Sequence, residues 1–384
     1  MKVETRSSLK VYWTAFIGLF FDYYDLFLFV YLDHVLVSFF DLSELQADWA
    51  QFTGLAGVGV GALVFGYLAD RFGRRRMMLI VFVVYLVGVA GLSLAWDFKS
   101  LIGFRLLASF ALGAEWGLSH TYLYENVNKA KRYWWAALLQ FSILGGLLAM
   151  FMKTLVLPYL GWRALFALSL IPIILLFAWR FKALSATDFK EDRTNCSLLE
   201  GVRKSWGRFL LCLLLASCAI ASGTVNIFVT KELPQSLLFS TLFWLNVVPG
   251  MLFGAWIVGR LGVRLSIIIY AVMLLSLSGL AYGSDWDQRQ YAFALGLPLL
   301  NGIPFGLMGA YFNEVFGDFR TMLSGAAYNL GRILAGFSPL LITGLSLDSE
   351  GNYYLFSIGL GIAMVFIAFW IQKPDTENIS GSFS

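Results

Sequence analysis

Residues 66–76 read Gly-Tyr-Leu-Ala-Asp-Arg-Phe-Gly-Arg-Arg-Arg and separate two long apolar stretches, at about 48–70 and 76–97. Each stretch has about the 20 residues that a helix needs to cross about 30 Å of hydrocarbon. An arginine-rich turn between them predicts two membrane-spanning helices that are joined on the cytoplasmic side. The same alternation of apolar stretches and short polar connections extends through the rest of the chain.

The overall composition is typical of a membrane protein. Of the 384 residues, 59% are hydrophobic and 14% are charged, whereas a soluble domain has about 25% charged residues. Because lipid offers the backbone no hydrogen-bond partners, a spanning segment is a helix or part of a closed barrel. Barrel strands alternate apolar and polar residues over about 10 positions, and this sequence does not. The sequence therefore predicts an all-α membrane protein.

Twelve transmembrane helices are expected, with boundaries accurate to a few residues. They lie at about 11–38, 48–70, 76–97, 99–124, 132–156, 162–181, 206–231, 236–260, 264–284, 288–313, 320–346 and 353–372. If both termini are cytoplasmic, 21 of the 28 lysines and arginines, Arg180 among them, fall in cytoplasmic segments and five in external ones. This bias predicts that orientation, in the cell (inner) membrane.

The chain is expected to divide into two six-helix halves. The polar segment 182–205 is the expected cytoplasmic linker between an N-terminal half (1–181) and a C-terminal half (206–384). A weak repeat supports the division, because Gly-Arg-Leu-Gly-Val-Arg at 259–264 follows span eight as the first turn follows span two, 189 residues earlier. Parallel six-helix repeats with a site between them are typical of transporters that work by rocking.

Several motifs resemble those of the major facilitator superfamily, over nearly the whole chain. The turn at 66–76 resembles the signature loop of that superfamily. Motifs in the first and fourth spans resemble its metabolite–proton symporters: Phe21–Asp25, Arg105–Leu107, Gly113–Gly117 and Tyr124–Glu125. Leu160–Phe166 and Tyr328–Arg332 resemble its sialate and monocarboxylate branch. The resemblance implies the twelve-helix fold and the transport of a small molecule.

The resemblance also implies a gate at the cytoplasmic ends of spans two to four. The gating residues by this resemblance are Gly66, Asp70, Arg71, Gly73, Arg74 and Glu125. Charges there can pair across helices when the inner side is closed and separate when it opens. A second, symmetrical gate is not expected, because Gly259 stands where the acid of the repeated loop would be.

Two ionisable side chains are expected at the same depth in the membrane. Asp25 in span one and Arg105 in span four both lie roughly 21 Å from the cytoplasmic face at 1.5 Å per residue. Such groups usually mark a pathway or a partner. A carboxyl group that loses and regains a guanidinium partner would exchange a proton in each cycle. We predict that Asp25 carries the proton and that Arg105 is its switchable counter-ion; the alternative is a permanent structural pair.

Two further acids belong to the predicted proton pathway. Asp22 shares the helix face of Asp25, and it either takes part in proton transfer or borders a cytoplasmic water pocket. Glu115, deeper in span four, is either a proton relay or part of the inner gate. A metal site is disfavoured, because no His or Cys lies at ligand spacing nearby; His34 and His120 are expected to be hydrogen-bonded bystanders.

Arg332 is the predicted anchor for a substrate carboxylate. It lies 12 residues into span eleven, near the membrane midplane, and its planar guanidinium is suited to two-point binding of a carboxylate. Tyr328 and Asn329 lie one turn away on the same side. The alternative is a pair with an acid, for which the late spans offer no obvious candidate.

Neutral polar and aromatic residues complete the predicted cavity. Gln140, Asn246 and Asn301 either line it or join neighbouring helices by hydrogen bonds. Amphipathic cavity walls are expected from the aromatic side chains of Tyr23, Tyr24 and Trp116.

The predicted function is proton-coupled symport of a small organic anion, a monocarboxylate or a sialate-like acid, by alternating access. The alternative is proton-driven export of a drug or siderophore, which Arg332 disfavours. A sensor would add a signalling domain, and no nucleophile–base or metal constellation indicates an enzyme. A net charge of +4 is too small to indicate nucleic acid. The expected partners are the anion, protons and the lipid bilayer, with no cofactor, and the protein is expected to be a monomer.

Overall fold

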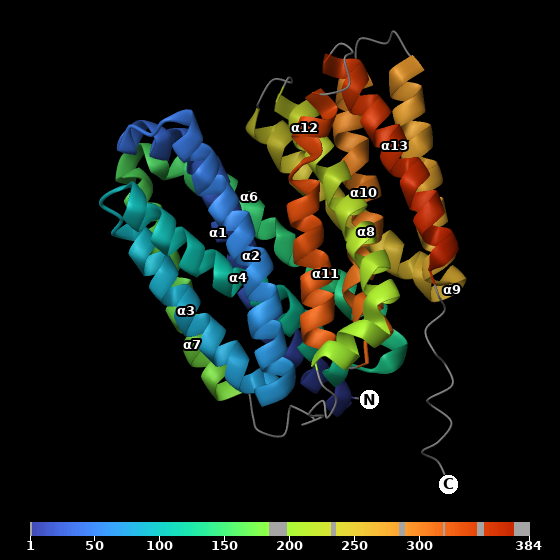
Figure 1. Ribbon diagram of the computed structural model, residues 1–384, viewed down its shortest axis with the longest axis horizontal. Coiled ribbons are helices and arrows are strands. Elements are labelled where there is room, and N and C mark those ends of the chain that lie inside the picture. The colour runs from blue at the N-terminus through green and yellow to red at the C-terminus, as the bar shows by residue number, and fades with distance from the viewer. Residues whose placement is uncertain are drawn as a thin grey trace.

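The computed structural model describes residues 2–183, 198–231, 236–283, 289–317, 319–343 and 349–371. Nearly all of these residues are helical, and no strand occurs among them. Figure 1 shows the helices, whose order is α1 (Lys2–Phe40), α2 (Glu44–Phe72), α3 (Arg74–Ser93), α4 (Phe98–Asn126), η1 (Lys129–Lys131), α5 (Arg132–Gln140), η2 (Phe141–Leu144), α6 (Gly145–Leu155), α7 (Leu157–Ala183), α8 (Leu198–Lys231), α9 (Leu237–Gly283), α10 (Arg289–Val315), α11 (Arg320–Ala335), α12 (Ser338–Thr343) and α13 (Ser349–Trp370).

The helices account for the twelve predicted crossings. In the described part of the chain, ten helical segments are long and apolar enough to span a membrane. One of them, α9, has 47 residues and turns at Gly262, so it contains two crossings. The short helices α11 and α12 together form another. The predicted all-α membrane fold is therefore confirmed.

Glycines with positive φ form the sharp turns between crossings. Gly73 (φ 100°) joins α2 to α3, and Gly262 (φ 78°) bends α9. A residue with a Cβ atom rarely adopts a positive φ, so glycine is the residue that fits at both turns. The two glycines occupy equivalent positions of the predicted repeat, which therefore corresponds to the same kind of turn in both halves.

The chain forms two helical bundles that lie side by side (Figure 1). In the first, α4 packs against α1, α2 and α3, and α7 packs against α1 and α3. In the second, α10 and α13 pack against α9, and α8 packs against α10 and α11. Contacts of α11 with α2 and α4, and of α5 with α9 and α10, join the bundles. Most of the predicted linker, residues 184–197, lies outside the described residues, and the proposed domain boundaries stay a prediction.

Small residues allow the helices to approach closely. A Cβ added to Gly61 of α2 would lie 1.8 Å from the carbonyl oxygen of Phe110, and one on Gly113 of α4 would lie 1.9 Å from that of Val58. Both distances are far below contact, so this crossing needs glycine on each helix. Close approach through glycine is a common way for helices to pack in membranes.

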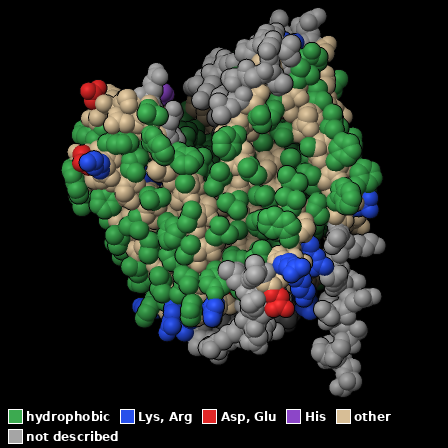
Figure 2. Space-filling model, viewed as in Figure 1, with side chains coloured by type: hydrophobic (Ala, Val, Ile, Leu, Met, Phe, Trp, Pro, Cys, Tyr) green, Lys and Arg blue, Asp and Glu red, His purple; other side chains and the backbone are tan. Residues whose placement is uncertain are grey.

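The surface separates into an apolar girdle and a basic end. Figure 2 shows hydrophobic side chains over most of the visible surface, with lysines and arginines gathered at the end that also holds the N-terminus in Figure 1. We call this end the basic face; it includes Arg71, Arg75 and Arg76 near the α2–α3 turn and Lys129 and Lys131 in η1. Exposed apolar side chains on this scale are suited to lipid rather than water.

Two predicted crossings are interrupted in the structure. The fifth is broken by the 3-10 helix η2, which follows Gln140 directly. The eleventh ends as α11 at Ala335 and resumes as α12 at Ser338, which places Arg332 in the last turn of α11. Broken helices often mark substrate sites in transporters, and each break here lies within four residues of a predicted site residue.

Candidate functional site

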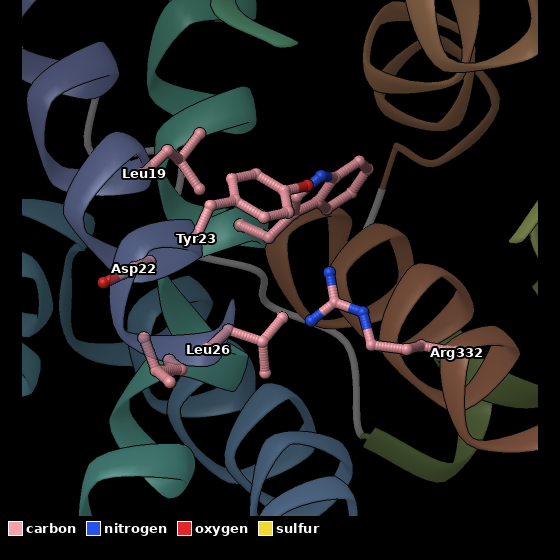
Figure 3. Close-up of a pocket in the computed structure, with 7 residues that line it drawn as sticks. Leu19, Asp22, Tyr23, Leu26 and Arg332 are labelled. Carbon is pink, nitrogen blue, oxygen red and sulfur yellow. The ribbon is translucent and has the colours of Figure 1, made fainter. Parts of the chain in front are cut away.

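A small pocket lies between the two bundles. Helix α1 supplies four residues of its lining at helical spacing, so they share one face of the helix. Figure 3 shows the Arg332 side chain reaching toward Tyr23 and Leu26 from the opposite side, while the Asp22 carboxyl points away from Arg332. The complete lining is Leu19, Asp22, Tyr23, Leu26, Leu112, Trp116 and Arg332.

Arg332 meets aromatic rings rather than an acid. Its guanidinium carbon lies 5.2 Å from the ring centre of Tyr328 and 5.9 Å from that of Tyr23. Such contacts stabilise a cation by about 0.5–2 kcal/mol. In the described ranges no carboxylate forms a direct ion pair with Arg332, although Asp22 lies within electrostatic range of its guanidinium. Its donors can therefore serve a ligand.

A chain of hydrogen bonds and stacked rings connects the bundles beside the pocket. Gln140 donates to the Tyr23 hydroxyl (3.2 Å), which shares a hydrogen bond with the Tyr328 hydroxyl (3.0 Å). The Tyr328 ring stacks on Trp116 with ring centres 4.0 Å apart, and Trp116 stacks on His120 at 4.1 Å. His120, expected to be a bystander, is therefore part of this buried stack.

Asp25 and Arg105 lie near each other without an ion pair. Asp25 is 2% exposed and accepts a hydrogen bond from Tyr85, a partner that the apolar sequence around Tyr85 gave no reason to expect. Arg105 is 3% exposed, and its guanidinium carbon lies 3.9 Å from the centre of the Phe29 ring. The predicted exchange between Asp25 and Arg105 stays a prediction.

Glu115 forms a buried ion pair with Arg180 inside the first bundle. Arg180 is fully buried; its Nη1 donates to Glu115 Oε2 (3.0 Å), its Nη2 also bonds the carboxylate, and its Nε donates to the Thr14 carbonyl (3.0 Å). Ser119 donates to the same carboxylate (2.6 Å). The assignment of Arg180 to a cytoplasmic segment was wrong, because its ion pair with the buried Glu115 of α4 holds it within the bundle.

The predicted gating residues form a network of ion pairs and hydrogen bonds at the basic face. Arg74 pairs with Glu125 and with Asp70 (3.1 Å), and Glu125 also pairs with Arg320 (3.0 Å), which the sequence did not single out. The Asp70 carboxylate accepts the backbone N–H groups of Thr321 (3.2 Å) and of the following residue at the start of α11. A negative charge is stabilised at a helix N-terminus.

The two other predicted gating positions differ in their contacts. A Cβ on Gly66 would lie 2.6 Å from the Cα of Met322, so Gly66 lets α2 and α11 cross closely between the bundles. Arg71 is exposed and donates to the Tyr67 hydroxyl on its own helix. Gly73 forms the turn described above. A further bond between bundles runs from the Tyr133 hydroxyl to Glu314 (2.5 Å).

Four predicted cavity residues make contacts between helices instead of lining the pocket. Asn329 donates to the carbonyls of Gly113 (2.9 Å) and Gly325 (3.1 Å). Asn246 donates to Leu295 (3.1 Å), and Tyr24 donates to Leu165 (3.5 Å). Asn301 accepts from Ser222 (2.8 Å) and Tyr270 (3.0 Å). For Asn246 and Asn301 these bonds favour the helix-joining alternative. No cluster of three acids, histidines or cysteines suited to a metal occurs in the described ranges.

The comparison with protein families defines the class. A family model described as the Major Facilitator Superfamily matches residues 15–319. The match covers more than half of the sequence, so the chain belongs to this superfamily, and the resemblance of the 66–76 turn is confirmed. The protein is a multi-pass membrane transporter and not an enzyme.

Relatives extend over nearly the whole chain. The cis,cis-muconate transport protein of Acinetobacter baylyi is 26% identical over 382 residues, covering 93% of this chain and 90% of the relative. The sialic acid transporter NanX of Escherichia coli is 24% identical, covering 94% and 91%. The solved proton:xylose symporter XylE matches with a TM-score of 0.74 at 17% identity, covering 96% of this chain and 95% of that one. The last likeness shows the fold alone.

Proposed function

We propose that this protein is a secondary active transporter that moves a small organic anion together with protons. The position of Arg332 supports this most: its guanidinium faces a pocket between the bundles, and no acid in the described part of the chain pairs with it. A planar fork of donors is suited to a carboxylate. Relatives named for muconate and sialic acid support an acidic substrate.

Asp22 and Asp25 are the proposed proton-binding groups, both on α1. Asp22 lines the pocket, and its Oδ2 atom has no hydrogen-bond partner among the described residues. It also lies within electrostatic range of the buried pair between Glu115 and Arg180. A proton carried with the anion cancels its charge, and moving one charge against 100 mV costs about 2.3 kcal/mol. Proton coupling therefore makes uptake of an anion favourable.

Alternating access is proposed to proceed by rocking of the halves 1–181 and 206–384 about the pocket. The ion pairs around Glu125 hold the basic face closed, whereas Figure 2 shows the surface hollowed between the bundles at the opposite end. We place the basic face and both termini in the cytoplasm of a cell (inner) membrane, following the bias of positive charge. The conformation described here is then the outward-open one.

The test uses proteoliposomes with an internal pH dye, and protein-free liposomes correct for passive entry of acids. Lactate, pyruvate, sialate, glycerate and neutral sugars are added one at a time. Acidification by at least one acid, lost in Asp25→Asn and in Arg332→Ala, is the expected result. If no acid acidifies the interior and a lipophilic cation is expelled instead, the proposal fails in favour of an exporter.

A further inference from the structure

Carboxylate binding by Arg332 leaves one donor of the pocket without a role. Trp116 lines the pocket and is 3% exposed, and its indole Nε1 finds no hydrogen-bond acceptor among the residues that the structure describes. Such buried donors are rare, because leaving one unpaired costs about 1–3 kcal/mol. A donor of this kind in a pocket wall is suited to an acceptor on the ligand.

The Trp116 ring is held in place by its neighbours. The Tyr328 ring stacks on Trp116 with ring centres 4.0 Å apart and an angle of 3° between the planes. The His120 ring also stacks on Trp116, with ring centres 4.1 Å apart and an angle of 27°. Tyr328 is in turn held by its hydrogen bond to Tyr23. Stacking against both neighbours fixes the plane of the indole ring, and the N–H group lies in that plane. The donor is therefore preorganised.

Apart from the Asp22 carboxyl, which points away from Arg332 (Figure 3), the rest of the pocket offers little to a polyhydroxylated ligand. Leu19, Leu26 and Leu112 contribute apolar wall, and the Tyr23 hydroxyl is already engaged by Gln140 and Tyr328. Each substrate hydroxyl buried there without a partner would cost about 1–3 kcal/mol. This environment favours a compact, largely apolar body between the two donor groups.

We infer that the substrate is a compact, largely apolar monocarboxylate with a second hydrogen-bond acceptor, and that Trp116 Nε1–H binds this acceptor while Arg332 holds the carboxylate. The inference rests on the proposed function and narrows its substrate class. It makes Trp116 a specificity-determining residue and excludes sugar acids as preferred substrates.

The test measures binding by titration calorimetry in lipid nanodiscs, so passive permeation does not interfere. The probes are benzoate, which has no acceptor besides its carboxylate, the three pyridine carboxylates, which place a ring nitrogen at each position, and gluconate as a polyhydroxylated acid. We expect at least one pyridine carboxylate to bind about tenfold more tightly than benzoate, since one hydrogen bond contributes about 1.4 kcal/mol at that ratio. Gluconate is expected to bind most weakly.

The matched variants are Trp116→Phe, which keeps a ring in the stack but removes the N–H, and Trp162→Phe, which changes a tryptophan 5% exposed on α7 and outside the pocket lining. Trp116→Phe should abolish the preference over benzoate, whereas Trp162→Phe should preserve that preference. If Trp116→Phe does not fold, the order of the Kd values of the probes in the unaltered protein still tests the inference.

Two results would overturn the inference. Equal binding of benzoate and all pyridine carboxylates, or tighter binding of gluconate, would show that neither the donor nor the apolar wall selects the ligand. In either case the proposed function would still be supported if an added organic acid acidified the interior of the proteoliposomes. If no acid acidified the liposomes and none bound, both would fail.

Discussion

Two arginines of this protein, Arg180 and Arg332, differ in the partners that surround the guanidinium group. Arg180 in the first bundle is fully buried, and all three of its nitrogens bond the Glu115 carboxylate or the Thr14 carbonyl. Arg332 lies between the bundles, lines a pocket and contacts the rings of Tyr23 and Tyr328.

This difference distinguishes an arginine that stabilises the fold from an arginine that can bind a ligand. A buried ion pair with its hydrogen bonds satisfied is a fixed part of the fold, and removing one partner leaves an uncompensated charge. A guanidinium that faces a pocket keeps its donors for a ligand and contributes less to folding. The first region should therefore respond to mutation in stability, and the second in binding.

The largest effect is expected at Arg180. Arg180→Ala leaves Glu115 buried and unpaired, which costs about 3–5 kcal/mol by analogy with other buried pairs. A clear fall in the melting temperature of the detergent-solubilised protein checks this. The double variant Arg180→Met with Glu115→Leu should recover most of the loss. If the single variant melts like the unaltered protein, the pair is not structural and the comparison fails.

A large effect on binding alone is expected at Arg332. Arg332→Ala removes the two charge-assisted bonds to a carboxylate, each of which contributes about 1.5–3 kcal/mol, so the Kd should rise at least about 100-fold. Calorimetry in nanodiscs measures the Kd, and the melting temperature should stay within the range of the exposed control Arg76→Ala. An unchanged Kd would remove Arg332 from the site.

An intermediate effect is expected in the gate at the basic face. Glu125→Gln weakens the pairs with Arg74 and Arg320, whose side chains are 11% and 23% exposed. Partly exposed pairs contribute about 1 kcal/mol or less each, so the population open on the basic face should rise several-fold. Labelling of a cysteine introduced at Met322, on the α11 side of the contact with Gly66, would report this; labelling as slow as in the single-cysteine parent would contradict it.

The smallest effect is expected at Asp97, a site remote from both arginines. Its exposed carboxylate caps α4, and the hydrogen bond from the Ser100 backbone N–H (2.7 Å) lowers the pKa of Asp97 below its usual value. The stabilisation is therefore present above the pKa of the unfolded chain and is lost as the pH falls through the lowered value. Asp97→Asn should reduce stability slightly at neutral pH, with a smaller difference in acid, and leave substrate Kd unchanged.

The pattern of apolar stretches and charges along the sequence was enough to predict the crossings, their connections and the region around Arg332. Span length and apolar content are properties of each segment, because transfer into lipid depends on local composition. The turn at 66–76 and its weaker counterpart at 259–264 required Gly73 and Gly262 for the same local reason. Arg332 was found because a charge within an apolar span stands out without knowledge of its neighbours.

The tertiary structure alone decided which side chains meet. The rotation of each helix about its axis depends on packing with neighbours distant in sequence, so equal depth did not pair Asp25 with Arg105. The same reason explains why Arg180, near the end of its span, turned inward to Glu115. It also explains why Tyr328 stacks on Trp116, whose indole N–H has no acceptor among the described residues.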